Sequence, residues 1–169
     1  MAKLRLAGVI RESIVDGPGF RMTVFVQGCP HHCEGCHNEQ TWDFDKGYDS
    51  TTERIMEELK KDPLVKGITL SGGEPFSQAE SLSVLAKEAK TTGYNVFCYT
   101  GYTFEKLLSE FPNHPEYEKL LSYCDWLVDG PFILSQRSLM LHFRGSKNQR
   151  ILDVPKSLEQ KKAVLSDLN

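Results

Sequence analysis

The chain lacks a long hydrophobic run and an excess of one charge. None of its 169 residues lies in an apolar stretch of the about 18 residues that a transmembrane helix needs. The basic start, residues 1–6, is not followed by the apolar segment of about 7–15 residues that marks a secretory signal, so we expect a cytoplasmic protein. The 20 Lys and Arg residues are balanced by 23 Asp and Glu residues without a basic block. We therefore expect neither a membrane nor a nucleic acid as a partner.

Repeats, low-complexity tracts and linkers are also missing, which predicts one domain over residues 1–169. With 40% hydrophobic residues, a chain of this length can bury one substantial core. Runs rich in β-branched and aromatic residues predict strands at 21–26, 67–70, 95–99, 126–128 and 150–154.

Helices are expected between these strands. Ser50 with Glu53, and Ser77 with Glu80, have the spacing of capping boxes that begin helices. Further helical patterns cover residues 104–108, 117–121 and 156–168. Strands that alternate with helices form parallel sheets through right-handed crossovers, so the predicted fold class is α/β.

The length limits which α/β fold is possible. A complete eight-fold β/α barrel needs about 250 residues, so we expect an incomplete barrel with parallel strands. Functional residues of such folds lie at the carboxyl ends of the strands. A cysteine-rich loop at 27–38 and the segment 71–75 each follow a predicted strand, and both are therefore expected at this edge.

Three of the five cysteines lie close together with C-x3-C-x2-C spacing: Cys29, Cys33 and Cys36. The odd total of five cysteines, in a reducing compartment, favours thiolate ligands over a disulfide framework. A cubane of four irons needs four ligands, so three thiolates leave one iron open to an external molecule.

Other chemistries fit parts of the same loop. Zinc could take the three cysteines with His31, His32 or His37, which would make a structural binding module. Residues 33–37 match the C-x-x-C-H haem attachment pattern, which would require export. A redox-active C-x-x-C pair would leave Cys29 without a role. The spacing alone leaves these alternatives open.

The cysteine loop together with Gly72-Gly73-Glu74-Pro75 resembles the radical S-adenosylmethionine superfamily over most of the chain. The resemblance implies a [4Fe-4S] cluster on the three cysteines, with S-adenosylmethionine on the open iron, and reductive cleavage of that cofactor to a 5′-deoxyadenosyl radical. The superfamily usually has an aromatic residue just before the third cysteine. Gly35 stands there in this chain, so adenine contact is expected from elsewhere, with His37 as a candidate.

Segments 16–21, 36–38 and 145–150 are similar to activating enzymes of anaerobic ribonucleoside-triphosphate reductases. This similarity implies that the radical abstracts hydrogen from a glycine Cα of the partner reductase, and that a low-potential donor such as flavodoxin supplies the electron. The alternatives are an activating enzyme of the pyruvate formate-lyase type, a small-molecule radical enzyme and, from a different class, the zinc-stabilised module.

The expected cofactor contacts lie in three segments. They are Gly35, Cys36, His37 and Asn38, then Gly72, Gly73 and Glu74, and finally Asp129. The Glu74 carboxylate suits an ammonium group, and the two glycines allow close backbone approach to a ligand. Asp129 could bind the cofactor or a cation, although an Asp before Gly is commoner in turns. Cys98 and Cys124 are isolated and are expected to be buried as small hydrophobes.

Overall fold

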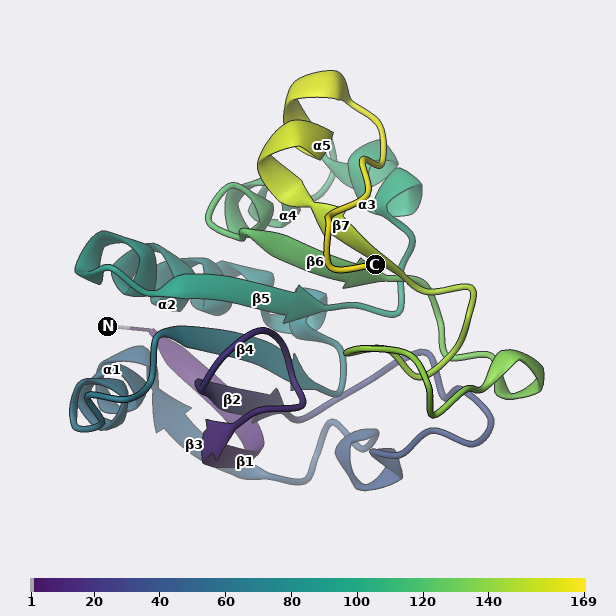
Figure 1. Cartoon of the computed structure of the whole chain (residues 1–169). Helices are drawn as coiled ribbons and strands as arrows, with labels where there is room; N and C mark the ends of the chain where they lie inside the picture. Colours follow the sequence, from purple (N-terminus) through teal and green to yellow (C-terminus); the bar gives the residue numbers. More distant parts are fainter. Residues whose placement is uncertain (1) are drawn as a thin grey trace.

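The computed structural model describes residues 2–169 and has a seven-stranded sheet at its centre (Figure 1). The strand order is β3-β1-β2-β4-β5-β6-β7. The elements in chain order are β1 (Lys3–Ser13), β2 (Arg21–Val26), η1 (Glu39–Thr41), β3 (Tyr48–Thr51), α1 (Thr52–Lys60), β4 (Gly67–Gly72), η2 (Pro75–Gln78), α2 (Ala79–Thr92), β5 (Asn95–Tyr99), α3 (Phe104–Glu110), α4 (Pro115–Leu121), β6 (Trp126–Asp129), η3 (Leu134–Gln136), β7 (Arg150–Asp153) and α5 (Val154–Gln160).

The centre of the sheet is parallel, as the sequence predicts. Strands β2, β4, β5 and β6 pair in parallel, and helices connect β4 to β5 and β5 to β6. The prediction was wrong for β7, which runs antiparallel to β6. A loop containing only the short η3 joins these two strands, and a connection without a crossover helix brings the chain back antiparallel. The sheet of the described residues is open, so the incomplete barrel is not confirmed.

All five predicted strands are present, and two more strands, β1 and β3, were not foreseen. The pairing of β1 with β2 shifts register between Leu6 and Gly8 and again between Ile10 and Ser13. Such bulges interrupt the alternation of apolar and polar residues by which a strand is found in a sequence. β3 has the polar sequence Tyr48–Thr51 at the edge of the sheet.

The helices begin later than the capping boxes predict. Thr51, rather than Ser50, caps α1 by accepting a hydrogen bond from the Arg54 amide. Ser77 lies inside η2, and α2 begins only at Ala79. The helix expected at 156–168 is confirmed only as far as Gln160, because Lys161 adopts a left-handed conformation with φ of 55°.

The two faces of the sheet are covered differently. The main core lies on one face, where Val24, Leu70 and Leu127 pack with buried side chains of the helices, such as Leu85 and Leu107. On the opposite face, which we call the concave face, Phe97, Val128 and Ile151 form a small cluster whose partly buried neighbours come from strands, loops and the C-terminal tail. No helix of residues 2–169 contributes to that second cluster, so the helices do not cover this part of the concave face.

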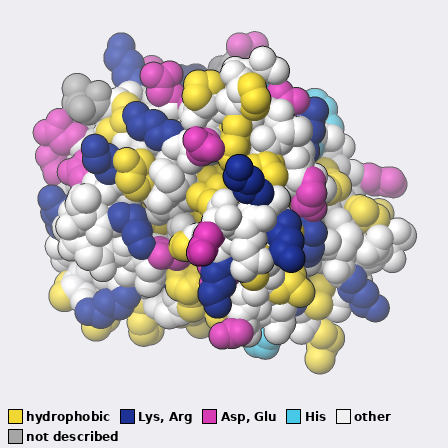
Figure 2. Space-filling model, turned by 90° about the horizontal axis from the view of Figure 1, so that it is seen from above, with side chains coloured by type: hydrophobic (Ala, Val, Ile, Leu, Met, Phe, Trp, Pro, Cys, Tyr) yellow, Lys and Arg dark blue, Asp and Glu magenta, His cyan; other side chains and the backbone are white. Residues whose placement is uncertain are grey.

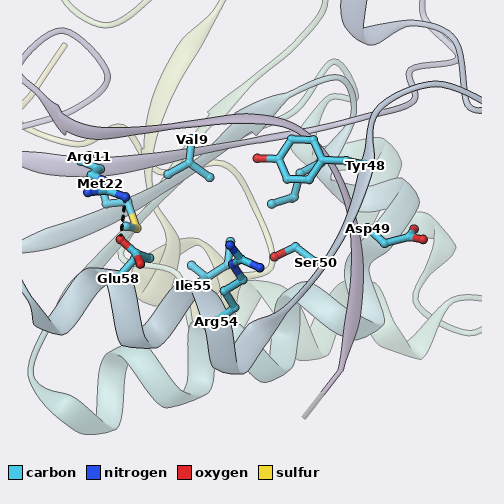
Figure 3. A pocket seen from close by; sticks show the side chains of 10 residues that line it. Val9, Arg11, Met22, Tyr48, Asp49, Ser50, Arg54, Ile55 and Glu58 are labelled. Carbon is cyan, nitrogen blue, oxygen red and sulfur yellow. Dashed lines mark ion pairs between the residues drawn. The ribbon is translucent and has the colours of Figure 1, made fainter.

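A separate cleft lies between β1, β3 and α1 and has a volume of about 290 Å³ (Figure 3). Val9, Met22 and Ile55 line it, and an ion pair between Arg11 and Glu58 closes one end at 3.0 Å. None of the expected site residues lines this cleft. No helix of residues 2–169 combines the length and apolar character needed to span a bilayer. Figure 2 shows acidic and basic side chains interspersed over one face of the molecule.

Candidate functional site

The cysteine loop and the Gly-Gly-Glu-Pro segment meet at the same edge of the sheet, as expected. The first follows β2 and the second follows β4, and these neighbouring strands are parallel with Val26 opposite Gly72. The Gly73 amide donates to the Val26 carbonyl at 2.8 Å, and the Glu74 amide donates to the Gly28 carbonyl at 2.8 Å. Backbone hydrogen bonds thus join the Gly-Gly-Glu-Pro segment to the end of β2 and the start of the cysteine loop.

This contact requires both glycines. Gly72 has a φ of 102°, and a Cβ there would lie 2.4 Å from the Val26 nitrogen. A Cβ on Gly73 would lie 2.3 Å from the Gly28 carbonyl oxygen. Since backbone atoms cannot move aside as the end of a side chain can, larger residues would push the two segments apart.

Glu74 is the polar centre of this junction, and its side chain is fully buried. Oε1 accepts hydrogen bonds from His31 Nε2 at 2.6 Å, from the Thr100 hydroxyl at 2.9 Å and from the Gly101 amide at 2.8 Å. Oε2 accepts from the Phe76 amide at 2.8 Å. These donors take up most of the acceptor capacity of a carboxylate. Glu74 therefore joins the cysteine loop, η2 and the end of β5, and its contact with a cofactor ammonium stays a prediction.

His31, Thr100 and Gly101 are partners of Glu74 that the sequence analysis did not foresee. The His31 ring lies edge-on to Tyr102, with centroids 4.5 Å apart, and covers the place where a Gly101 side chain would be. Their position in the sequence could have indicated this contact, because Thr100 and Gly101 directly follow a strand and the carboxyl ends of adjacent parallel strands lie at one edge of the sheet.

The three clustered cysteines are free thiols with different exposure. Cys29 is buried, and burial raises the pKa of its thiol, whereas Cys33 and Cys36 are half-buried. The Asn38 amide donates to Cys36 Sγ at 3.3 Å, a contact that would stabilise a thiolate there. In residues 2–169 no three Cys, His, Asp or Glu side chains are gathered as a ready metal site. The donor set has the soft sulfur chemistry that an iron–sulfur cluster requires, and the thiols would draw together as it binds.

The histidines of the loop have other neighbours. His31 is bound to Glu74, His32 stacks on Trp42 with centroids 4.5 Å apart, and His37 lies 5.7 Å from the Phe132 ring. A closed zinc site from the three cysteines and one histidine is therefore not assembled among the described residues either.

An open cavity of about 550 Å³ extends from the cysteine loop along the concave face. Cys36, His37 and Asn38 line it at the cysteine loop, and Ser71 and Tyr99 belong to the strands that form its floor. Burial raises the pKa of the Tyr99 hydroxyl, which donates to the Phe143 carbonyl at 2.6 Å. The cavity is of the size that small-molecule sites occupy, about 300–1,000 Å³.

Gly35 is exposed and is not among the residues that line this cavity. A Cβ there would lie 2.7 Å from Leu134 and 3.4 Å from Phe132. Phe132 lines the cavity next to His37. Phe132 thus places an aromatic ring near the third cysteine, where the motif itself has Gly35. In the sequence, only the position of Phe132 shortly after β6 indicated that it could lie at the site.

Asp129 is buried and bound within the protein. Its carboxylate accepts from the Phe104 amide at the start of α3 at 2.8 Å and pairs with Arg150, whose Nε lies 3.0 Å from Oδ1. Arg150 also pairs with Glu105 at 2.7 Å, and these hydrogen bonds raise the pKa of the guanidinium. Both Asp129 oxygens are engaged, so the contacts favour a structural role over the expected cofactor contact.

The loop at 145–150 is folded back on the end of β6. Asn148 Nδ2 donates to the Pro131 carbonyl at 2.7 Å, and Gln149 Nε2 donates to the Gly130 carbonyl at 3.1 Å. These side chains order the wall of the cavity near Gly145. Cys98 and Cys124 are both buried, as expected, and burial together with the adjacent Cys124 thiol raises the pKa of Cys98.

Comparisons with known proteins show the family of this chain. A family model described as a 4Fe-4S single cluster domain matches residues 15–152, which include the three clustered cysteines. A Vibrio cholerae protein named anaerobic ribonucleoside-triphosphate reductase-activating protein is 39% identical over 146 residues, 82% of this chain and 90% of that protein. The Escherichia coli K12 protein of the same name is 33% identical over 144 residues, 80% of this chain and 90% of its own length.

The solved structures give a more distant likeness. The crystal structure of QueE from Escherichia coli has a TM-score of 0.50 and 18% identity, and the match covers 60% of this chain and 54% of that one. At this identity the likeness concerns the fold alone. The sequence relatives, in contrast, match over most of both chains. The chain therefore belongs to the family of anaerobic ribonucleoside-triphosphate reductase-activating proteins, and its residues 15–152 match the model of a 4Fe-4S single cluster domain.

Proposed function

We propose that the chain is a radical S-adenosylmethionine enzyme, with one such domain over residues 1–169, that activates an anaerobic ribonucleoside-triphosphate reductase. Membership of the activating-protein family supports this activity. The observation that carries it in the structure is the junction at one sheet edge between the cysteine loop and the Gly-Gly-Glu-Pro segment. The incomplete barrel is part of this proposal, supported by helices on one face of the sheet and a cavity on the other.

Cys29, Cys33 and Cys36 would hold a [4Fe-4S] cluster and leave one iron for S-adenosylmethionine. When bound there, the cluster would supply one electron to the sulfonium, and reductive cleavage of a carbon–sulfur bond would give methionine and a 5′-deoxyadenosyl radical. Hydrogen transfer from a glycine Cα of the reductase would then give 5′-deoxyadenosine and a glycyl radical. The protein holds and shields these partners, while the cofactors supply the chemistry.

The residues of the chain have positioning roles in this scheme. Glu74 and His31 hold the cysteine loop against the ends of β4 and β5. The Asn38 amide stabilises negative charge on the Cys36 sulfur. His37 and Phe132 border the cavity beside the third cysteine and offer ring surfaces for the adenine.

The electron donor and the place of action complete the proposal. Thiolate-bound clusters reach potentials of about -700 mV, so a low-potential donor such as flavodoxin suits this site. The five cysteines of the described residues are all free thiols, which fits a reducing compartment such as the cytoplasm.

The test is anaerobic reconstitution with iron and sulfide, followed by assay of 5′-deoxyadenosine. Single Cys→Ala variants at 29, 33 and 36 should each lose bound iron and product formation. Cys124→Ala is the matched control, because that thiol lies outside the cysteine loop and the variant should retain both. Activity that survives all three substitutions, or bound zinc without iron and sulfide, would contradict the proposal. A glycyl signal in electron paramagnetic resonance after addition of the reductase would identify the partner.

A further inference from the structure

Two pairs of exposed apolar side chains stand at the mouth of the cavity. Leu139 and Met140 are 84% and 89% exposed, and Ile14 and Val15 are 66% and 70% exposed. We call these four residues the apolar rim. Single exposed hydrophobic residues are normal on protein surfaces, whereas contiguous exposed apolar patches mark interaction sites.

The apolar rim is continuous with the candidate site. Val15 and Leu139, one residue from each pair, line the same cavity as Cys36. Ile10 and Leu141, near the two pairs in the chain, line it as well. Apolar side chains therefore line the cavity from the two loop tips to the cysteine loop, interspersed with Asp16, Arg137 and Arg144.

Both loops are anchored below their exposed tips. The Ser13 hydroxyl donates to Asp16 at 2.6 Å, and the Thr69 hydroxyl donates to the Asp16 carbonyl at 2.6 Å. On the other side, Ser138 and Gly145 are joined by a backbone hydrogen bond of 3.2 Å, and Tyr99 holds Phe143. Anchored stems reduce the entropy lost when the tips bind a partner.

We propose, on the basis of the proposed function, that the apolar rim binds the reductase segment that carries the target glycine. The occupant is an extended main-chain stretch with apolar side chains on both sides of that glycine. A highly reactive radical cannot leave the cavity to find its target, so the glycine Cα must enter. Glycine has no side chain to block the approach, and its apolar neighbours then contact the rim from opposite sides. No helix of residues 2–169 packs against the Phe97 cluster of the concave face, which leaves this route open.

The test separates binding from cofactor cleavage. The variants are the double substitutions Ile14→Ser with Val15→Ser, and Leu139→Ser with Met140→Ser. The matched control is Leu64→Ser, because Leu64 is 59% exposed on the loop between α1 and β4, outside the cavity lining. Binding of the reductase to reconstituted protein is measured by biolayer interferometry. The 5′-deoxyadenosine formed with a chemical reductant is measured without the reductase.

Each rim variant should bind the reductase at least about ten-fold more weakly, because it lacks two apolar side chains that the complex would bury, and should give little glycyl signal. Its 5′-deoxyadenosine formation without the reductase, and its circular dichroism, should match those of the wild type and the Leu64 variant. Wild-type binding and activation by both rim variants would overturn the inference. A change only in self-association, measured by sedimentation, would also overturn it and assign the rim to a second copy of the chain. Absence of 5′-deoxyadenosine from the wild type would instead refute the proposed function, since the binding assay needs no turnover.

Discussion

Replacing Glu74 should destabilise the fold before it affects any chemistry. Glu74→Ala removes a fully buried carboxylate that accepts from the amides of Phe76 and Gly101, and the Thr100 hydroxyl and His31 Nε2 lose the same acceptor. A buried donor left without a partner costs about 1–3 kcal/mol. The two backbone amides have no other acceptor within reach, so their loss of a partner costs about 2–6 kcal/mol together.

The other two donors add less. The Thr100 hydroxyl can rotate, and His31 is 17% exposed and can reach water. Water that enters the vacated space would recover part of the loss, since the site is polar. We therefore expect the free energy of unfolding to fall by about 3–5 kcal/mol, out of the about 5–15 kcal/mol of a typical domain. Glu74→Gln should cost about 1–3 kcal/mol, because its amide group cannot accept from all four donors.

The measurement is urea unfolding of the cluster-free protein under anaerobic, reducing conditions, followed by circular dichroism. Glu80→Gln is the matched control, because Glu80 is an exposed acid in the first turn of α2 and should change stability by less than about 0.5 kcal/mol. If Glu74→Ala unfolds within about 0.5 kcal/mol of the wild type, the hydrogen-bonded junction does not carry the stability assigned to it.

Three further changes test other parts of the structure. Gly73→Ala should lower the free energy of unfolding in urea by about 1–3 kcal/mol, because its Cβ would lie 2.3 Å from a backbone oxygen. Gly8→Ala is the control, since a Cβ there meets nothing within 4 Å, and equal stability of the two variants would contradict the close packing. Asp129→Asn should cost about 1–3 kcal/mol and increase amide exchange at the start of α3, because the Arg150 pair and the bond to Phe104 are weakened; unchanged exchange there would argue against the anchoring role. Burial, and to a smaller extent the charge of Glu74, raises the pKa of Tyr102 to about 12. The contribution of the protonated Tyr102 hydroxyl to folding stability is therefore fully present below about pH 10 and is lost as the pH rises towards 12. Wild-type stability should therefore fall more steeply than that of Tyr102→Phe between about pH 10 and 12, and parallel curves in urea unfolding would refute this assignment.

The sequence by itself determined the chemistry of the cysteine loop. Its three thiols lie within residues 29–36, and their spacing together with the Gly-Gly-Glu-Pro segment predicts a cluster with an open iron. The five predicted strands are also present, because short runs of β-branched and aromatic residues report burial locally. The meeting of the cysteine loop with Gly72 and Gly73 followed from the rule that parallel strands end at one edge.

Only the tertiary structure decided what the buried charged groups do. Glu74 is bound by His31 and by Thr100 and Gly101, which lie far from it in the sequence, and Asp129 is bound by Arg150 because β7 returns antiparallel beside β6. Pairing across such distances leaves no local pattern, since the residues approach only when strands set their register. The edges of the sheet were also decided by tertiary contacts. Bulges interrupt the alternating pattern of β1, so the sequence did not reveal this strand. The number and direction of the edge strands depend on contacts between segments that are distant in the sequence.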